Sequence, residues 1–184
     1  MRRIFVAVDI SEQARQRAAD HITGLRDMSS PGGISWVNAN KLHLTLRFIG
    51  NCDDHGLQKV ISSAQFAAEN SGPIRLNISG TGVFPNAKRA RVLWLGVGGE
   101  VDKMAKTADL FNNAYGSKGE HEVFKPHLTI ARVKDASKNW EVISKHINSQ
   151  FGPVEFEVSE IVVYESELHP KGSIYSAVAR YVLR

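Results

Sequence analysis

Two repeated short sequences constrain the fold of this chain more than any other feature. Residues 43–46 read His-Leu-Thr-Leu and residues 127–130 read His-Leu-Thr-Ile. Residues 72–79 and 152–159 each begin with Gly-Pro and continue with alternating apolar and polar residues. The first pair is offset by 84 positions and the second by 80. Two matched landmarks in the same order and at nearly the same offset indicate a duplicated unit.

Alternation and helical periodicity predict the elements between these landmarks. Further strands are predicted at 3–8, 91–97 and 173–183. Apolar residues three and four apart predict helices that begin near Ser11, Asp53, Val101 and Ser137. Short links within strand pairs indicate an α+β fold of two pseudo-symmetric lobes around a central cleft, each a mainly antiparallel sheet with outer helices. Because no low-complexity linker is present, residues 1–184 are predicted to form a single bilobal domain.

Composition excludes several classes of protein. With 42% apolar residues the chain is too hydrophobic to be disordered, and no apolar run approaches the ~20 residues of a membrane span. The apolar run near the start ends after five residues at Asp9, which is shorter than the ~7–15 of a signal peptide. The single cysteine, Cys52, allows no internal disulfide. We therefore expect a cytoplasmic monomer without membrane contact, whose net charge of +4 fits an anionic partner or simply a basic surface.

The repeated His-x-Thr pattern carries a specific chemistry. Side chains alternate in a strand, so His43 and Thr45 share one face, as do His127 and Thr129. If the two units are related by symmetry, two imidazoles and two hydroxyls face one cleft. One histidine can act as acid and the other as base in the in-line hydrolysis of a phosphodiester, while the hydroxyls donate to its non-bridging oxygens. This mechanism requires no metal and no other cofactor.

These stretches resemble the paired signatures of the two-histidine (2H) phosphoesterase superfamily. Within it, the chain is similar to the RNA 2',3'-cyclic phosphodiesterases, also called 2'-5' RNA ligases, which are RNA-processing enzymes. The resemblance covers nearly the whole chain. It is carried by residues 42–50 (LHLTLRFIG), 124–133 (FKPHLTIARV), 3–9 (RIFVAVD), 82–85 (GVFP) and 91–96 (RVLWLG).

The resemblance implies a substrate and a role for each site residue. The substrate is an RNA with a 2',3'-cyclic phosphate end, and the product is a 2'-phosphomonoester. By family precedent His43 is the proton donor to the departing 3' oxygen, and His127 is the proton acceptor that activates water. Thr45, Thr129 and Arg132 bind the phosphate. The family also joins 5'-hydroxyl RNA ends into 2'-5' linkages without a nucleotide cofactor, which is the same chemistry in reverse.

Two arginines test the alternation argument. Arg132 matches a phosphate-binding arginine of the family, yet five residues after His127 it should face away in a regular strand. Strand twist, a bulge or the end of the strand could turn the Arg132 side chain toward the cleft. Arg47 shares its parity with His43 and Thr45, so it could reach the cleft or lie in solvent.

Two other functions fit the same residues. A related enzyme could cleave small cyclic nucleotides or ADP-ribose cyclic phosphate, and a non-catalytic module could bind RNA ends without turnover.

Several residues outside the two motifs have a structural as well as a functional interpretation. The basic run 88–91 fits an RNA contact or a solvated hairpin tip equally well. His21 and His146, within helical patterns, are expected at surface or boundary positions. The candidates for stacking on a terminal base, for each of which a core position is the stronger interpretation, are Trp36, Phe84, Trp94 and Tyr164.

Overall fold

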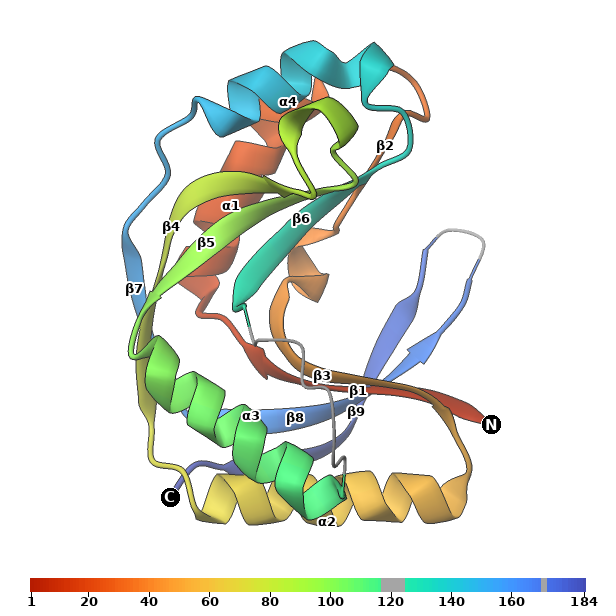
Figure 1. Ribbon diagram of the computed structural model, residues 1–184, viewed down its shortest axis with the longest axis vertical. Helices are drawn as coiled ribbons and strands as arrows, with labels where there is room; N and C mark the ends of the chain where they lie inside the picture. Colours follow the sequence, from red (N-terminus) through yellow and green to blue (C-terminus); the bar gives the residue numbers. More distant parts are fainter. Residues whose placement is uncertain (117–124, 170–171) are drawn as a thin grey trace.

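The computed structural model describes residues 1–116, 125–169 and 172–184, and shows two antiparallel sheets that form the arms of a C-shaped molecule (Figure 1). The first, here called the His43 sheet, has the order β3 (His43–Cys52), β1 (Arg2–Asp9), β8 (Glu160–Glu167) and β9 (Ile174–Val182). The second, the His127 sheet, has the order β2 (Ile34–Trp36), β6 (His127–Val133), β5 (Val92–Gly99), β4 (Ile74–Phe84) and β7 (Val154–Val158). The predicted α+β class with two mainly antiparallel sheets is confirmed.

Helices cover the outer face of each sheet (Figure 1). Helix α2 (Asp54–Glu69) packs on the His43 sheet with α3 (Val101–Tyr115) beside it, while α1 (Glu12–Arg26) and α4 (Trp140–Ile147) lie against the His127 sheet. The predicted cap of α1 is confirmed, because the Ser11 side chain accepts a hydrogen bond from the backbone N–H of Ala14 at 3.2 Å. No helix among the described residues is long and apolar enough to span a membrane.

The hydrophobic core confirms the predicted alternation in both histidine strands. Leu44 and Leu46 of β3 are buried, and so are Leu128 and Ile130 of β6. Apolar burial of this kind contributes roughly 1.5–3 kcal/mol for each large side chain, which fixes the face that each strand presents to the core. The side chains that alternate with them are therefore directed away from the core.

Neither sheet is built from one half of the chain alone. The two Gly-Pro strands, β4 and β7, pair with each other in the His127 sheet, with Ile74 opposite Val158 and Ile78 opposite Val154. Strands β8 and β9 then return to the His43 sheet beside β1. Strand β8 was not predicted because its residues Ile161–Val163 are all buried, so it shows no alternation.

Helix α4 differs from the sequence expectation. A 3-10 turn at Ser137–Asn139 precedes it, and its first residue, Trp140, is 51% exposed. The buried stripe consists instead of Val142, Ile143 and His146. The expectation that His146 lies at the surface or a boundary is thus wrong, because eight residues are too few for periodicity to fix the buried face.

Candidate active site

Histidine 43 begins β3, an edge strand of its sheet. In the pairing with β1, His43 lies opposite Asp9 and Thr45 lies opposite Ala7. The ring Nδ1 is 2.7 Å from the carbonyl oxygen of Lys41, and Nε2 is 3.1 Å from the Thr45 hydroxyl. A carbonyl oxygen can only accept a hydrogen bond, so we infer that the neutral ring carries its proton on Nδ1. Nε2 is then the basic nitrogen on the side of Thr45.

Histidine 127 is held in the same way. Its Nδ1 is 2.8 Å from the carbonyl oxygen of Lys125, again two residues upstream. His127 pairs with Gly96 of β5, and the Phe84 ring meets the imidazole edge-on with centroids 5.2 Å apart. Both histidines therefore use Nδ1 to fix the ring on the backbone and direct Nε2 away from it, where that of His43 contacts the Thr45 hydroxyl. Phe124, the first residue of the second family signature, lies outside the described residues.

Each histidine strand has a β-bulge three residues after its histidine. The pairing of β3 with β1 skips Leu46, and the pairing of β6 with β5 skips Ile130. One extra residue brings the fifth residue after each histidine onto the histidine's own face. Those residues are Phe48 and Arg132, and both line the pocket described below. Arg47, which regular alternation placed beside Thr45, is not among the described residues that line it.

A pocket of about 250 Å³ lies between the two sheets. The structure brings all of the sequence-predicted site residues to its walls: His43, Thr45, His127, Thr129 and Arg132. Sequence reasoning missed several other lining residues, which are Arg3, Phe5, Val37, Lys41, Phe48, Ser166, Ser173 and Tyr175. Arg3 and Phe5 lie two apart on β1, so alternation would have found them if the pairing of β1 with β3 had been known. Ser166 and Tyr175 belong to β8 and β9 and carry no local signal.

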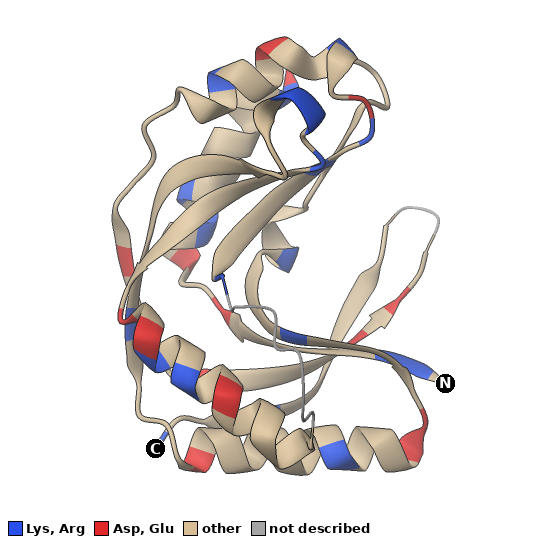
Figure 2. Ribbon diagram, in the orientation of Figure 1, with Lys and Arg blue, Asp and Glu red and all other residues tan. Residues whose placement is uncertain are grey.

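The pocket is electropositive. Arg3, Lys41 and Arg132 line it, and no carboxylate is among its lining residues in the described ranges. Figure 2 shows basic residues at the start of β1, the strand that carries Arg3. This distribution attracts an anion such as a phosphate. Within the same ranges, no three His, Cys, Asp or Glu side chains gather as a metal site would require.

The surroundings of His43 act on its pKa in opposite directions. Burial lowers the pKa of the imidazole, while its bond to the Lys41 carbonyl and the charge of Asp9 partly oppose this shift. The Asp9 carboxylate accepts hydrogen bonds from the Tyr164 hydroxyl at 2.7 Å and from Arg180 at 3.1 Å. A phosphodiester beside the ring adds negative charge, which favours the protonated form. An anion in the pocket would thus partly reverse the effect of burial on the pKa of His43.

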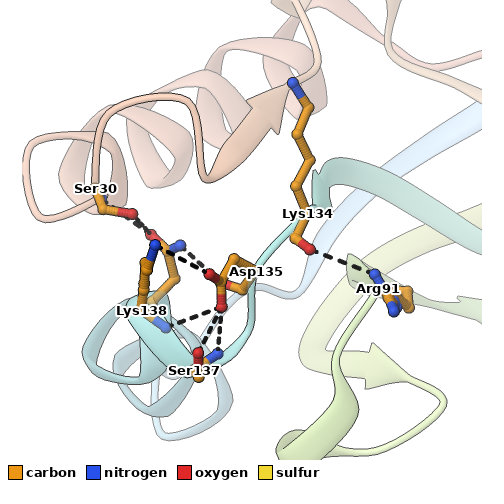
Figure 3. Close-up of polar contacts among 7 residues, drawn as sticks. Ser30, Arg91, Lys134, Asp135, Ser137 and Lys138 are labelled. Atoms are coloured by element: carbon orange, nitrogen blue, oxygen red, sulfur yellow. Dashed lines mark hydrogen bonds and ion pairs between the residues drawn. The ribbon is translucent and has the colours of Figure 1, made fainter.

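The turn that follows Arg132 is held by a polar network (Figure 3). The Asp135 carboxylate accepts hydrogen bonds from the Ser137 hydroxyl at 2.6 Å and from the backbone N–H groups of Ser137 and Lys138. These bonds, the Ser137 hydroxyl first, lower the pKa of the Asp135 carboxyl. Asn139 in turn accepts from the backbone N–H of Ser30 at 3.0 Å. The network holds the turn after β6 against the segment that leads into β2.

The basic run 88–91 does not reach the pocket among the described residues. Lys88 and Arg89 lie in a short 3-10 helix in the connection between β4 and β5. Arg91 donates to the carbonyl oxygen of Lys134 at 3.4 Å (Figure 3). Of the two interpretations of this run, the geometry favours the hairpin tip.

Comparison with known proteins places these features in context. A family model described as LigT like phosphoesterase matches residues 8–94 and 97–175. Proteins named RNA 2',3'-cyclic phosphodiesterase are similar in sequence: that of Thermotoga maritima is 31% identical over 96% of this chain and 92% of the relative, and that of Methanocaldococcus jannaschii is 32% identical over 97% and 99%. The crystal structure of TT0787 from Thermus thermophilus superposes with a TM-score of 0.81 at 27% identity, covering 99% of this chain and 98% of that one. E. coli LigT, crystallised with 3'-AMP, has a TM-score of 0.74 at 21% identity, covering 99% and 98%, and shares the fold.

Proposed function

Because this chain belongs to the LigT-like phosphoesterase family, we propose that it hydrolyses RNA 2',3'-cyclic phosphate ends to 2'-phosphomonoesters in the pocket between its sheets. One observation carries the proposal. Two imidazoles line one basic pocket, and each is anchored through Nδ1 to a carbonyl two residues upstream, which leaves both Nε2 atoms for proton transfer. The names of the relatives supply the substrate class, RNA with a cyclic phosphate end.

In the proposed reaction the two histidines act on opposite sides of phosphorus. His127 accepts a proton from water at Nε2 while the water oxygen forms a bond to phosphorus. The bond from phosphorus to the 3' oxygen breaks, and protonated His43 donates its Nε2 proton to that oxygen. The assignment of acid to His43 and base to His127 rests on the resemblance to the family, since both rings have the same backbone anchor.

The remaining pocket residues stabilise the charge on phosphorus oxygens in this scheme. Thr45 and Thr129 each offer a hydroxyl on the histidine face, and Arg132 offers a guanidinium brought there by the bulge at Ile130. Charge-assisted hydrogen bonds of this kind are the strong ones, and they gain strength as the oxygens become more negative in the transition state. A 5'-hydroxyl in place of water would give 2'-5' ligation by the same displacement: the hydroxyl oxygen bonds to phosphorus, its proton passes to His127, and the 3' oxygen leaves with the proton of His43.

We also propose that residues 1–184 form one domain that arose by internal duplication. The matched His-x-Thr motifs, the shared Nδ1 anchors and the bulges at the same offset from each histidine support this proposal. Chance reproduction of all three features at both motifs is a weaker explanation than descent from one unit.

A defined substrate tests the function. An oligoribonucleotide with a 2',3'-cyclic phosphate is incubated with the protein in EDTA, beside small cyclic nucleotides and ADP-ribose cyclic phosphate. We expect turnover of the RNA and a phosphate left on the 2' oxygen. Substitution of either histidine, His43→Ala or His127→Ala, should lower kcat by at least ~10²-fold. Tight binding of the RNA without turnover, or turnover of the small substrates alone, would contradict the proposal.

A further inference from the structure

A second pocket adjoins the one that holds the histidines. It has a volume of about 500 Å³ and shares three lining residues with the first pocket, namely Arg3, Phe48 and Ser166. Phe48 is 52% exposed although it lies on a strand. The Arg3 guanidinium lies over its ring, with Cζ 5.0 Å from the ring centroid. An aromatic ring and a guanidinium thus form the boundary between the two pockets.

The charges around this boundary leave Arg3 available to a ligand. Arg2 is bound to Glu165 through two hydrogen bonds of 3.0 and 2.6 Å, which occupies its guanidinium. Among the ion pairs of the described residues, none involves Arg3. An aromatic ring with one face free stacks with any base, and an arginine outside the ion pairs beside it binds a phosphate. Phe48 and Arg3 together have the properties of a subsite that binds a nucleotide whichever base it carries.

The position of Phe48 fixes which nucleotide it would meet. It follows His43 by five residues on the same strand, with one residue taken up by the bulge, so the two Cα atoms are roughly 13 Å apart at ~3.3 Å per residue. That is further than a ribose with its cyclic phosphate extends, so the ring would meet a base, and the second pocket beyond it offers room for the nucleotide that precedes the terminal one.

The second pocket is lined by the carboxylates of Glu165 and Glu167 beside Arg2 and Arg3, and Glu165 is paired with Arg2. A third pocket, on the other side of His43, is lined by Asp9, Lys41 and Arg180. Its cations are engaged, because Arg180 is paired with Asp9 and Glu160 and Lys41 donates to the carbonyl oxygen of Ser173. Among the ion pairs of the described residues none involves Arg3, so the direction toward Phe48 offers an RNA phosphate a cation that is not already bound.

We propose that Phe48 and Arg3 form the subsite for the nucleotide immediately 5' to the cyclic phosphate end. The base of that nucleotide stacks on Phe48, and the phosphodiester that joins it to the terminal nucleotide pairs with Arg3. This inference rests on the proposed function, and it adds to it a preference for oligonucleotides over mononucleotides. Ser166 lines both pockets and lies where the chain passes from one to the other.

Phe48→Leu tests the subsite with matched substrates. We expect its KM to rise about tenfold for a trinucleotide with a 2',3'-cyclic phosphate end, the scale found when a stacked base loses its aromatic partner. With cytidine 2',3'-cyclic phosphate, which has no second nucleotide, the rise in KM should be several-fold smaller, because only the contact of Phe48 with the catalytic pocket is altered. Phe48→Trp should keep the wild-type KM for the trinucleotide. The control is Phe66→Leu, which removes a ring of similar exposure, 47%, from α2.

Binding measured without turnover separates the subsite from the catalytic proposal. The probe is a 5'-fluorescein trinucleotide that ends in a 2'-phosphate. Phe48→Leu should weaken its binding about tenfold, and Arg3→Gln should reduce the slope of log Kd against log salt by about 0.7, the loss of one contact to a single strand. Unchanged binding by both variants would overturn the subsite. Equal effects on the mononucleotide and the trinucleotide would also overturn it, because the ring would then contact the terminal nucleotide. Failure of the wild-type protein to cleave either cyclic substrate would count against the proposed function alone.

Discussion

A buried pair of histidines outside the pocket makes the protein sensitive to acid. His146 of α4 is fully buried, and its Nε2 lies 3.0 Å from the carbonyl oxygen of Gly82 and 3.2 Å from that of Trp94. Because carbonyls only accept, Nε2 of His146 must carry the proton. Its Nδ1 therefore accepts from Nε2 of His21 on α1, 3.0 Å away. The pair joins both helices to strands β4 and β5, and it does so with neutral rings.

The pKa values give the sign of the effect. Burial lowers the pKa of His21 to about 4, and His146 and Lys145 add to this shift. Burial also lowers the pKa of His146. The unfolded chain therefore binds protons first as the pH falls, so this part of the stability is complete above about 6.5 and is lost between about 6.5 and about 4. For a fully buried ring, this shift in the pKa of His21 would correspond to about 3 kcal/mol of the free energy of unfolding. Because the ring is only half-buried, solvent screening reduces the contribution to about 1–2 kcal/mol.

Urea unfolding of the wild-type protein and of His21→Gln at several pH values between about 7 and about 4.5 measures this contribution. The glutamine amide can still donate to His146 but does not titrate, so the variant should lose about 1–2 kcal/mol less of its free energy of unfolding than the wild type over that range. The control is His55→Gln, at an exposed position near the start of α2. It shows how far the exchange of an exposed histidine for glutamine changes the pH dependence of the free energy of unfolding. Parallel loss of stability in the wild type and in His21→Gln would refute the reasoning.

Three further predictions concern the pocket. Thr129→Val should lower kcat about tenfold by removing one hydrogen bond to a charged oxygen. The acidic and alkaline limbs of the pH profile of kcat should not move. Asp9→Asn removes a charge that raises the pKa of His43, so the alkaline limb of kcat/KM, where the acid loses its proton, should move to lower pH; an unmoved limb would exclude His43 as the acid. Arg132→Lys keeps the charge but loses the planar pair of donors, and kcat should fall while the salt dependence of KM is retained.

The sequence predicted which side chains face away from the core better than it predicted the path of the chain between the two sheets. Leu44 and Leu128 at core positions implied that His43 and His127 face the opposite way, and this local rule held. A bulge was one of three alternatives for Arg132, and the sequence could not decide among them or predict the bulge at Leu46, because a bulge depends on the register with a neighbouring strand that alternation alone does not identify. Likewise His146 was misplaced because its burial depends on carbonyl oxygens of two strands distant in sequence.

The two motifs build a symmetric frame that holds an asymmetric site. Both histidines have the same anchor and both strands have a bulge at the same offset, yet the fifth residue is a phenylalanine on β3 and an arginine on β6. The guanidinium of Arg132 therefore lies on the strand of His127, and the ring of Phe48 lies on the strand of His43. A symmetric pair of imidazoles cannot select the direction of an in-line displacement. In the proposed reaction the two residues after the bulges supply the asymmetry, because Arg132 would hold the phosphate beside His127 while Phe48 would contact the RNA beside His43.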